Sequence, residues 1–138
     1  MSEMLLNISL RVWHPTLPHD SISGRIGLLE RFAHTAGDPR VSPSGSPLDG
    51  VYEETYVSMQ MVRKRTAEIG DEIESCYDRI EMHADFIRSI VNAGGKVEFY
   101  VSAFLKDLGG FELNSLLLKR LANTGMGFAI ELYPEECE

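Results

Sequence analysis

The sequence predicts an α+β fold: a two-layer α/β sandwich, ferredoxin-like in flavour, with helices on one face of a mostly antiparallel sheet. Its strand-like segments alternate between apolar and polar residues, as strands do when only one face of their sheet is buried. Its expected elements follow the order strand, helix, strand, strand, helix, strand, helix, strand. A layer of helices on one side of the sheet explains both observations.

Residues 71–92 form the longest expected helix, and the rest of the chain is organised around it. Two acidic residues occupy its first turn, where the helix dipole favours negative charge, and two glycines follow its last turn. Met82 and Phe86 lie on its opposite side, away from the core. The apolar residues recur at three- and four-residue steps and form one stripe, Ile73, Cys76, Tyr77, Ile80, Ala84, Ile87 and Val91.

Five segments are expected to be strands, at 6–13, 30–35, 52–62, 96–104 and 128–132. Most of them show the two-residue alternation of a strand with one buried face. The predicted inward residues are Leu6, Ile8, Leu10 and Val12, then Val57, Met59 and Met61, then Val97, Phe99, Val101 and Ala103, and finally Phe128, Ile130 and Leu132.

Two shorter helices connect these strands. The first begins at Asp20 or Ser21 and has Ile22, Ile26 and Leu29 as its apolar positions. The second begins after an asparagine cap at position 114 and ends at a glycine at position 125.

Three segments are expected to lie outside helices and strands. Residues 36–50 are rich in Gly, Pro, Ser and Asp, and they are long for a connection in a small domain, so we expect a mobile or functional loop. Residues 63–68 are charged and are expected to lead through a turn into the long helix. Residues 134–138 form an acidic tail.

Length and charge narrow the class of protein. The 138 residues fit a single domain, 1–138, and the net charge of −8 disfavours a nucleic-acid groove or an anionic membrane surface. Neither a signal peptide nor an apolar run of about 20 residues is evident, so we expect a cytoplasmic protein. Free thiols are the simplest interpretation of Cys76 and Cys137, and a disulfide between them stays open.

Two stretches of the chain resemble a known family. They are the C-terminal segment GGFELNSLLLKRLANTGMGFAIELY and the opening strand with the following segment DSISGRIGL. Together, from Leu6 to Tyr133, they resemble the bacterial domain-of-unknown-function family numbered four-two-seven-nine. The resemblance implies a small α/β domain and transfers no catalytic residue to this chain.

Few residue groupings point to catalysis. His14, His19 and Asp20 are close enough in sequence to share a metal, but their spacing matches no established zinc pattern. Glu98 and Glu131 fall on two expected strands, where paired carboxylates can divide acid and base roles, although charge pairing with an arginine is the simpler interpretation. We therefore expect no catalytic residue, no metal and no cofactor.

The face of the sheet without helices is the strongest candidate for a binding site. Aromatic and arginine side chains are enriched at protein interfaces, and an open sheet face also allows two copies to stack. An ordinary solvated face, self-association and a small-ligand site all stay open. The candidate binding residues are Arg11, Trp13, Glu98, Tyr100, Glu131 and Tyr133, with Ser58 and Gln60 beside them.

These observations favour a non-enzymatic binding or interaction protein that is bacterial and forms a homodimer or binds another protein. One version is an immunity-type protein, whose acidic surface blocks a basic partner. The alternative is a small hydrolase or transferase that uses the turn at 14–19 and the loop at 36–50. We expect no nucleic-acid or membrane partner, and a small-molecule ligand stays open.

Overall fold

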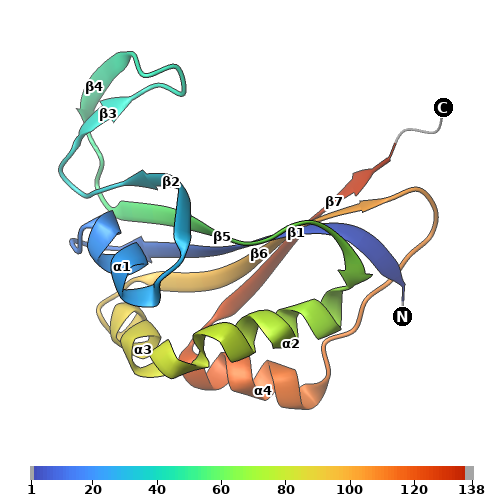
Figure 1. Ribbon diagram of the computed structural model, residues 1–138. Helices are drawn as coiled ribbons and strands as arrows, with labels where there is room; N and C mark the ends of the chain where they lie inside the picture. The colour runs from blue at the N-terminus through green and yellow to red at the C-terminus, as the bar shows by residue number, and fades with distance from the viewer. Residues whose placement is uncertain (1, 136–138) are drawn as a thin grey trace.

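The computed structural model describes residues 2–135, in which helices lie on one face of a five-stranded sheet and a two-stranded hairpin projects beyond it (Figure 1). The strands are β1 (Glu3–His14), β2 (Leu29–His34), β3 (Pro39–Val41), β4 (Pro47–Val51), β5 (Thr55–Glu68), β6 (Lys96–Leu105) and β7 (Gly127–Pro134). The helices are α1 (His19–Ile26), α2 (Ile69–Ile80), α3 (Ala84–Asn92) and α4 (Ser115–Thr124), with a 3₁₀ turn η1 (Glu81–His83) between α2 and α3. Within residues 2–135, no helix has the length and apolarity needed to cross a membrane.

The sheet has the order β2-β5-β1-β6-β7, and every neighbouring pair is antiparallel except β6 and β7. The four strands β2, β5, β1 and β6 reproduce the ferredoxin-like arrangement, in which two βαβ units interleave their strands. α4 then carries the chain to β7, which adds a parallel strand at the edge. The predicted α/β sandwich with a mostly antiparallel sheet is therefore confirmed.

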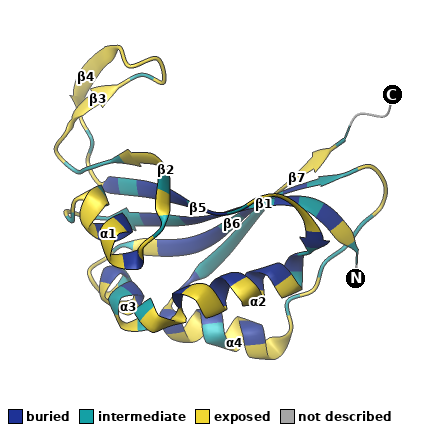
Figure 2. Cartoon of the chain, viewed as in Figure 1, coloured by how far each residue is buried: buried dark blue, intermediate teal, exposed yellow. Residues whose placement is uncertain are grey.

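The core lies between the sheet and the helices, and Figure 2 shows their facing sides as buried. The inward residues predicted for β1, β5 and β6 are all buried. Two predicted core positions are wrong. Leu29 begins β2 and is 73% exposed, and Leu132 lies in the outer half of β7 and is 56% exposed.

The predicted helix 71–92 is divided in two. It begins earlier than predicted, at Ile69, and η1 interrupts it between α2 and α3. A 3₁₀ turn has three residues per turn, so it changes the side of the helix that faces the sheet. Ile87 and Ile90 are consequently buried in α3, whereas the predicted Val91 is only half-buried.

Two predicted connections are strands. Residues 63–68 continue β5 as a strand paired with β1, instead of turning toward α2. Residues 36–50 hold most of the hairpin β3–β4, whose two strands pair with each other and not with the main sheet. We call residues 37–51 the arm; Figure 2 shows both of its strands as exposed, and Figure 1 shows it projecting beyond β2, away from the helices.

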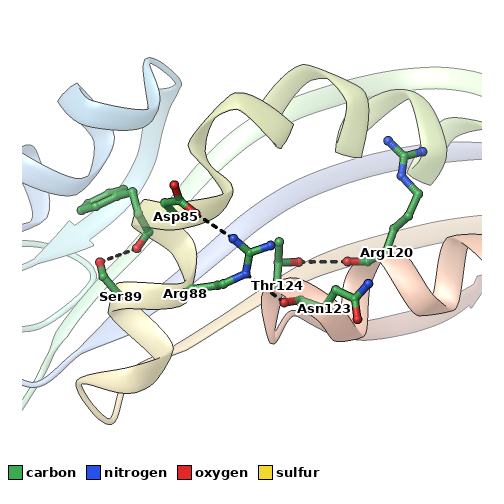
Figure 3. Close-up of polar contacts among 7 residues, drawn as sticks. Asp85, Arg88, Ser89, Arg120, Asn123 and Thr124 are labelled. Atoms are coloured by element: carbon green, nitrogen blue, oxygen red, sulfur yellow. Dashed lines mark hydrogen bonds and ion pairs between the residues drawn. The ribbon is translucent and has the colours of Figure 1, made fainter.

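Polar contacts join α4 to the other helices. Arg88 of α3 donates through Nε to the Asn123 carbonyl oxygen at 3.0 Å and through Nη1 to Asp85 at 2.8 Å (Figure 3). Arg120 of α4 donates to Asp78 at 2.7 Å and to Glu81 at 2.8 Å. The contact of Arg88 with Asn123 therefore fixes α4 against α3. The contacts of Arg120 fix α4 against the junction of α2 and η1.

The division between buried and exposed positions near η1 can be tested by adding charge. We expect Ile80→Asp to destabilise the protein by about 3 kcal/mol or more, because Ile80 is 1% exposed and the new carboxylate would be buried without a partner. Met82→Asp should change stability by only about 0.5 kcal/mol, because Met82 is 79% exposed. Urea unfolding measures both, and equal losses would contradict this placement of the helix.

The arm should be the first internal site of proteolytic cleavage. Its tip is a turn closed by hydrogen bonds between Ser42 and Ser46, and the pairing of its strands involves only the arm itself. Local opening there should cost little free energy, because few apolar contacts are lost. Limited proteolysis with mass spectrometry should find the first cut within 37–51. A first cut within α2 or α3 would contradict this expectation.

Candidate functional site: the open sheet face

An ion-paired glutamate lies at the centre of the sheet face that carries no helix, which we call the open face. Arg11 of β1 and Glu98 of β6 are directly paired across the two strands. Arg11 donates through Nε to Glu98 Oε1 at 3.0 Å, and Lys96 Nζ lies 3.4 Å from Glu98 Oε2. Glu98 is only 4% exposed, although the open face has no helix layer. Two cations therefore balance one carboxylate that its neighbours shield from water.

Aromatic rings surround the Arg11 guanidinium. It lies 4.0 Å from the ring centroid of Tyr100 and 5.3 Å from that of Trp13, and Lys96 Nζ lies 5.0 Å from the Trp13 ring. Such contacts stabilise a cation by about 0.5–1 kcal/mol at exposed sites. Gly95 allows the backbone before β6 to lie close to Trp13 of β1, because a Cβ at position 95 would lie 2.4 Å from the Trp13 carbonyl oxygen.

The aromatic contacts continue toward β2. Trp13 and Tyr56 have ring centroids 5.1 Å apart, and Tyr56 lies 6.0 Å from His34. His34 then stacks on Tyr52, which follows the arm, at 3.6 Å and an interplanar angle of 5°. Burial lowers the pKa of His34, so its stacked ring is predominantly neutral near pH 7.

The contacts also continue toward β7. The Tyr133 hydroxyl donates to Glu131, and the hydroxyls of Tyr133 and Tyr100 hold the pKa of Glu131 below its usual value. Tyr133 in turn stacks on Phe104 at 5.1 Å. An uninterrupted series of side chains thus crosses all five strands. We call it the aromatic row; its members are Tyr52, His34, Tyr56, Trp13, Arg11, Tyr100, Glu131 and Tyr133.

The open face brings the six predicted binding residues onto one surface, but it does not pair the two carboxylates. Glu98 lies opposite Gly127, whereas Glu131 lies opposite Ser102. The two positions are four residues apart along the strands, which corresponds to about 13 Å. Tyr100 occupies the outward position of β6 between Glu98 and Ser102, which is the residue opposite Glu131. The arrangement therefore gives no carboxylate pair for acid–base chemistry.

The β2 side of this surface was not predicted from the sequence. Tyr56 is in phase with Ser58 and Gln60, so the alternation of β5 could have placed it on the open face. Phe32 and His34 face the same way on β2, but the short strand gave no clear alternation. Ser58 is buried despite facing outward.

The histidines of the turn at 14–19 have structural roles. His14 Nδ1 accepts hydrogen bonds from the Thr16 and Leu17 N–H groups at 3.1 and 2.8 Å. His19 Nδ1 lies 2.8 Å from the same Glu30 oxygen that accepts from Ser23 Oγ at 2.6 Å.

The carboxylate thus lies between the imidazole and the hydroxyl, whereas a nucleophilic serine needs the imidazole beside it. The sequence grouping of His14, His19 and Asp20 does not become a metal site. Across residues 2–135, no three His, Cys, Asp or Glu side chains are grouped closely enough to hold a metal ion.

Cys76 is a buried free thiol on α2. Burial raises its pKa to about 12, which keeps the thiol protonated and makes it a poor nucleophile near neutral pH. The partner in the disulfide that the sequence left open, Cys137, lies outside the described residues.

Comparison with known proteins gives no relative from which function could be transferred. No family model matches the chain. The curated proteins and the solved structures contain no match either. The resemblance to the four-two-seven-nine family therefore stays a prediction, and the open face has to be interpreted from its own chemistry.

The turn at 14–19 should make stability depend on pH. Burial lowers the pKa of His14 below its usual 6.5, so the unfolded chain takes up this proton before the folded chain does. The stability that the neutral His14 ring contributes is present above pH 6.5 and is lost as the pH falls below this value. We expect His14→Asn, which keeps an acceptor but does not titrate, to lose less stability than the wild type between about pH 7.5 and 5.5. Urea unfolding at each pH measures this, and equal losses would contradict it.

Proposed function

We propose that the protein is a bacterial, cytoplasmic, non-enzymatic interaction protein that binds a second copy of itself through the open face. The observation that carries this proposal is the aromatic row, which crosses the whole sheet and places Trp13, Tyr100 and Arg11 together at its centre. Tryptophan, tyrosine and arginine are the residue types that most often dominate interface energetics. Open sheet faces can also pack on one another at a spacing of about 10 Å.

The charge of the open face supports self-association over binding to a strongly charged partner. Along the aromatic row, Arg11 and Lys96 contribute two positive charges, and Glu98 and Glu131 contribute two negative charges. The chain as a whole has a net charge of −8. Two such faces can meet about a twofold axis without net repulsion at their centres, and their residual polar groups can pair across the interface.

Exposed apolar side chains extend the same surface. Leu29 lies opposite Gln60 and Phe32 opposite Ser58, which places both on the open face. They are 73% and 64% exposed. Complete burial of such a side chain is worth about 1.5–3 kcal/mol, so covering β2 together with the aromatic row would stabilise a dimer.

Replacement of the only tryptophan tests the proposal. We expect Trp13→Ala to weaken association by about 2 kcal/mol, or about 30-fold in Kd, because it removes the ring between Arg11 and Tyr56. The buried side of β1 is unchanged, so the fold should persist. Sedimentation velocity over a concentration series measures the effect. Met82→Ala is the control, because Met82 is exposed on the helix layer.

Two outcomes would contradict self-association through this face. The first is a wild type that stays monomeric at the highest concentration. The second is a Trp13→Ala variant that dimerises as tightly as the wild type and the Met82→Ala control, which would place the interface elsewhere.

The immunity-type version is a second candidate, and it would use another surface. Glu68, Asp71, Glu74 and Glu112 line one groove of about 230 Å³ beside the start of α2. A basic protein could pair with these carboxylates. Such binding weakens steeply with salt, whereas association through the neutral open face should depend on salt much less. Salt dependence therefore separates the two candidates.

The enzymatic alternative has less support. The His14 ring accepts hydrogen bonds within the turn, and the His19 ring is hydrogen-bonded to Glu30 of β2. The groove of about 360 Å³ at the base of the arm is lined by His34, Arg40, Val51, Tyr52, Glu53 and Glu54, and it includes neither of them. A small-molecule ligand at that groove would be bound beside the aromatic row.

A further inference from the structure

The edge of β5 lacks a neighbour over half of its length. β2 pairs with β5 only as far as Gln60, whereas β5 continues to Glu68. Over residues 61–68, within the described chain, only β1 pairs with β5. The backbone N–H and C=O groups on the other edge of this stretch pair with no strand of the described chain. Exposed edges of this kind can accept a further strand.

A basic groove runs between this edge and α2. It has a volume of about 310 Å³, and three arginines, Arg63, Arg65 and Arg79, contribute to its lining. Ser75 adds a hydroxyl, and Glu72 adds the single carboxylate among the described lining residues. These lining residues therefore have a net charge of about +2, whereas the chain as a whole has a net charge of −8. The groove is thus a local concentration of positive charge in an acidic protein.

Two of the three guanidinium groups are held in place. Arg65 Nε lies 3.1 Å from Glu72 Oε1, and Arg79 Nη1 donates to the Met61 carbonyl oxygen at 3.0 Å. Arg79 thus already bonds to the backbone of this part of β5. Arg63 is exposed, and within residues 2–135 it has no ion-pair partner.

A backbone irregularity separates the two arginines of β5. Lys64 has a φ of 51°, and it is the only described residue other than glycine with a positive φ. Its N–H donates to Asn7 Oδ1 at 2.8 Å, which fixes the irregular pairing with β1. Bulges redirect side chains at sheet edges. Here Arg63 and Arg65 both line the groove, although Lys64 does not.

We propose that this groove binds an acidic, extended peptide segment, which adds as a strand beside residues 62–66 of β5. Main-chain hydrogen bonds to the free edge would supply affinity, and alternate glutamate or aspartate side chains would pair with Arg63, Arg65 and Arg79. Charged residues at a strand edge can also serve only to prevent aggregation. That role would not require a groove beside the edge, or an arginine contributed by α2. This site is separate from the open face.

The probe is a fluorescein-labelled peptide, Val-Glu-Val-Glu-Val-Glu, whose three carboxylates lie on one side when it is extended. Anisotropy measures its binding to the full chain. We expect Arg63→Glu to weaken binding about tenfold or more, because it reverses the charge of the groove's guanidinium that makes no hydrogen bond or ion pair within residues 2–135. Lys119→Glu is the matched control, since it makes the same charge change at an exposed position of α4. It should bind like the wild type.

Three further probes test the strand-addition geometry and the charge requirement. A peptide with glutamine in place of glutamate should bind about tenfold more weakly, and so should one N-methylated at alternate amides. Inorganic phosphate should displace the acidic peptide only weakly. Trp13→Ala should leave peptide binding unchanged, which keeps this proposal distinct from the open-face dimer.

Other results would overturn the proposal. Equal weakening by Arg63→Glu and Lys119→Glu would show that only overall charge matters. Equal binding of the N-methylated peptide, or complete displacement by phosphate at a concentration matched to the peptide, would reduce the groove to a site for small anions. Absence of wild-type binding to the acidic peptide would exclude the site.

Discussion

The register of β1 is the constraint on which both sides of this molecule depend. β1 is hydrogen-bonded to β5 on one side and to β6 on the other, and its residues alternate strictly between the helix layer and the open face over Leu10–Trp13. A slip by one residue would bury Arg11 and Trp13 and expose Leu10. The apolar side chains that β1 buries therefore also set the position of every polar and aromatic side chain on its other side.

The Arg11–Glu98 pair transmits this register to the open face. An arginine on the central strand can satisfy a neighbouring carboxylate and two aromatic rings at once, because its planar guanidinium donates in its plane and stacks on its face. Glu98 is buried beside Arg11 and Lys96 on a face that no helix of the described chain covers. Removing either partner would leave a shielded charge uncompensated, so this pair couples the fold to the surface that we propose as an interface.

Strands β1, β5 and β6 and the central part of the open face could be predicted from the sequence, because they depend on period-two alternation, which the side chains display directly. The same rule could not show where β5 ends, since residues 63–68 are mostly charged and only their pairing with β1 defines them as a strand. The interruption at η1 was also hidden, because Ile80, Ile87 and Ile90 lie close to one helical stripe. The arm has turn-forming residues throughout, and two short strands in it bury too little to leave an apolar pattern.

Charge is distributed unevenly over the three surfaces, and this distribution gives each a different range of partners. The start of α2 is acidic, the open face is balanced and the β5–α2 groove is basic. A net charge of −8 describes none of the three. Charges at exposed positions act mainly within a Debye length of about 8 Å at physiological salt, so a ligand at one surface experiences its local charges far more than the total. An acidic protein can therefore present an interface with balanced charges to a second copy and a positive groove to an acidic segment.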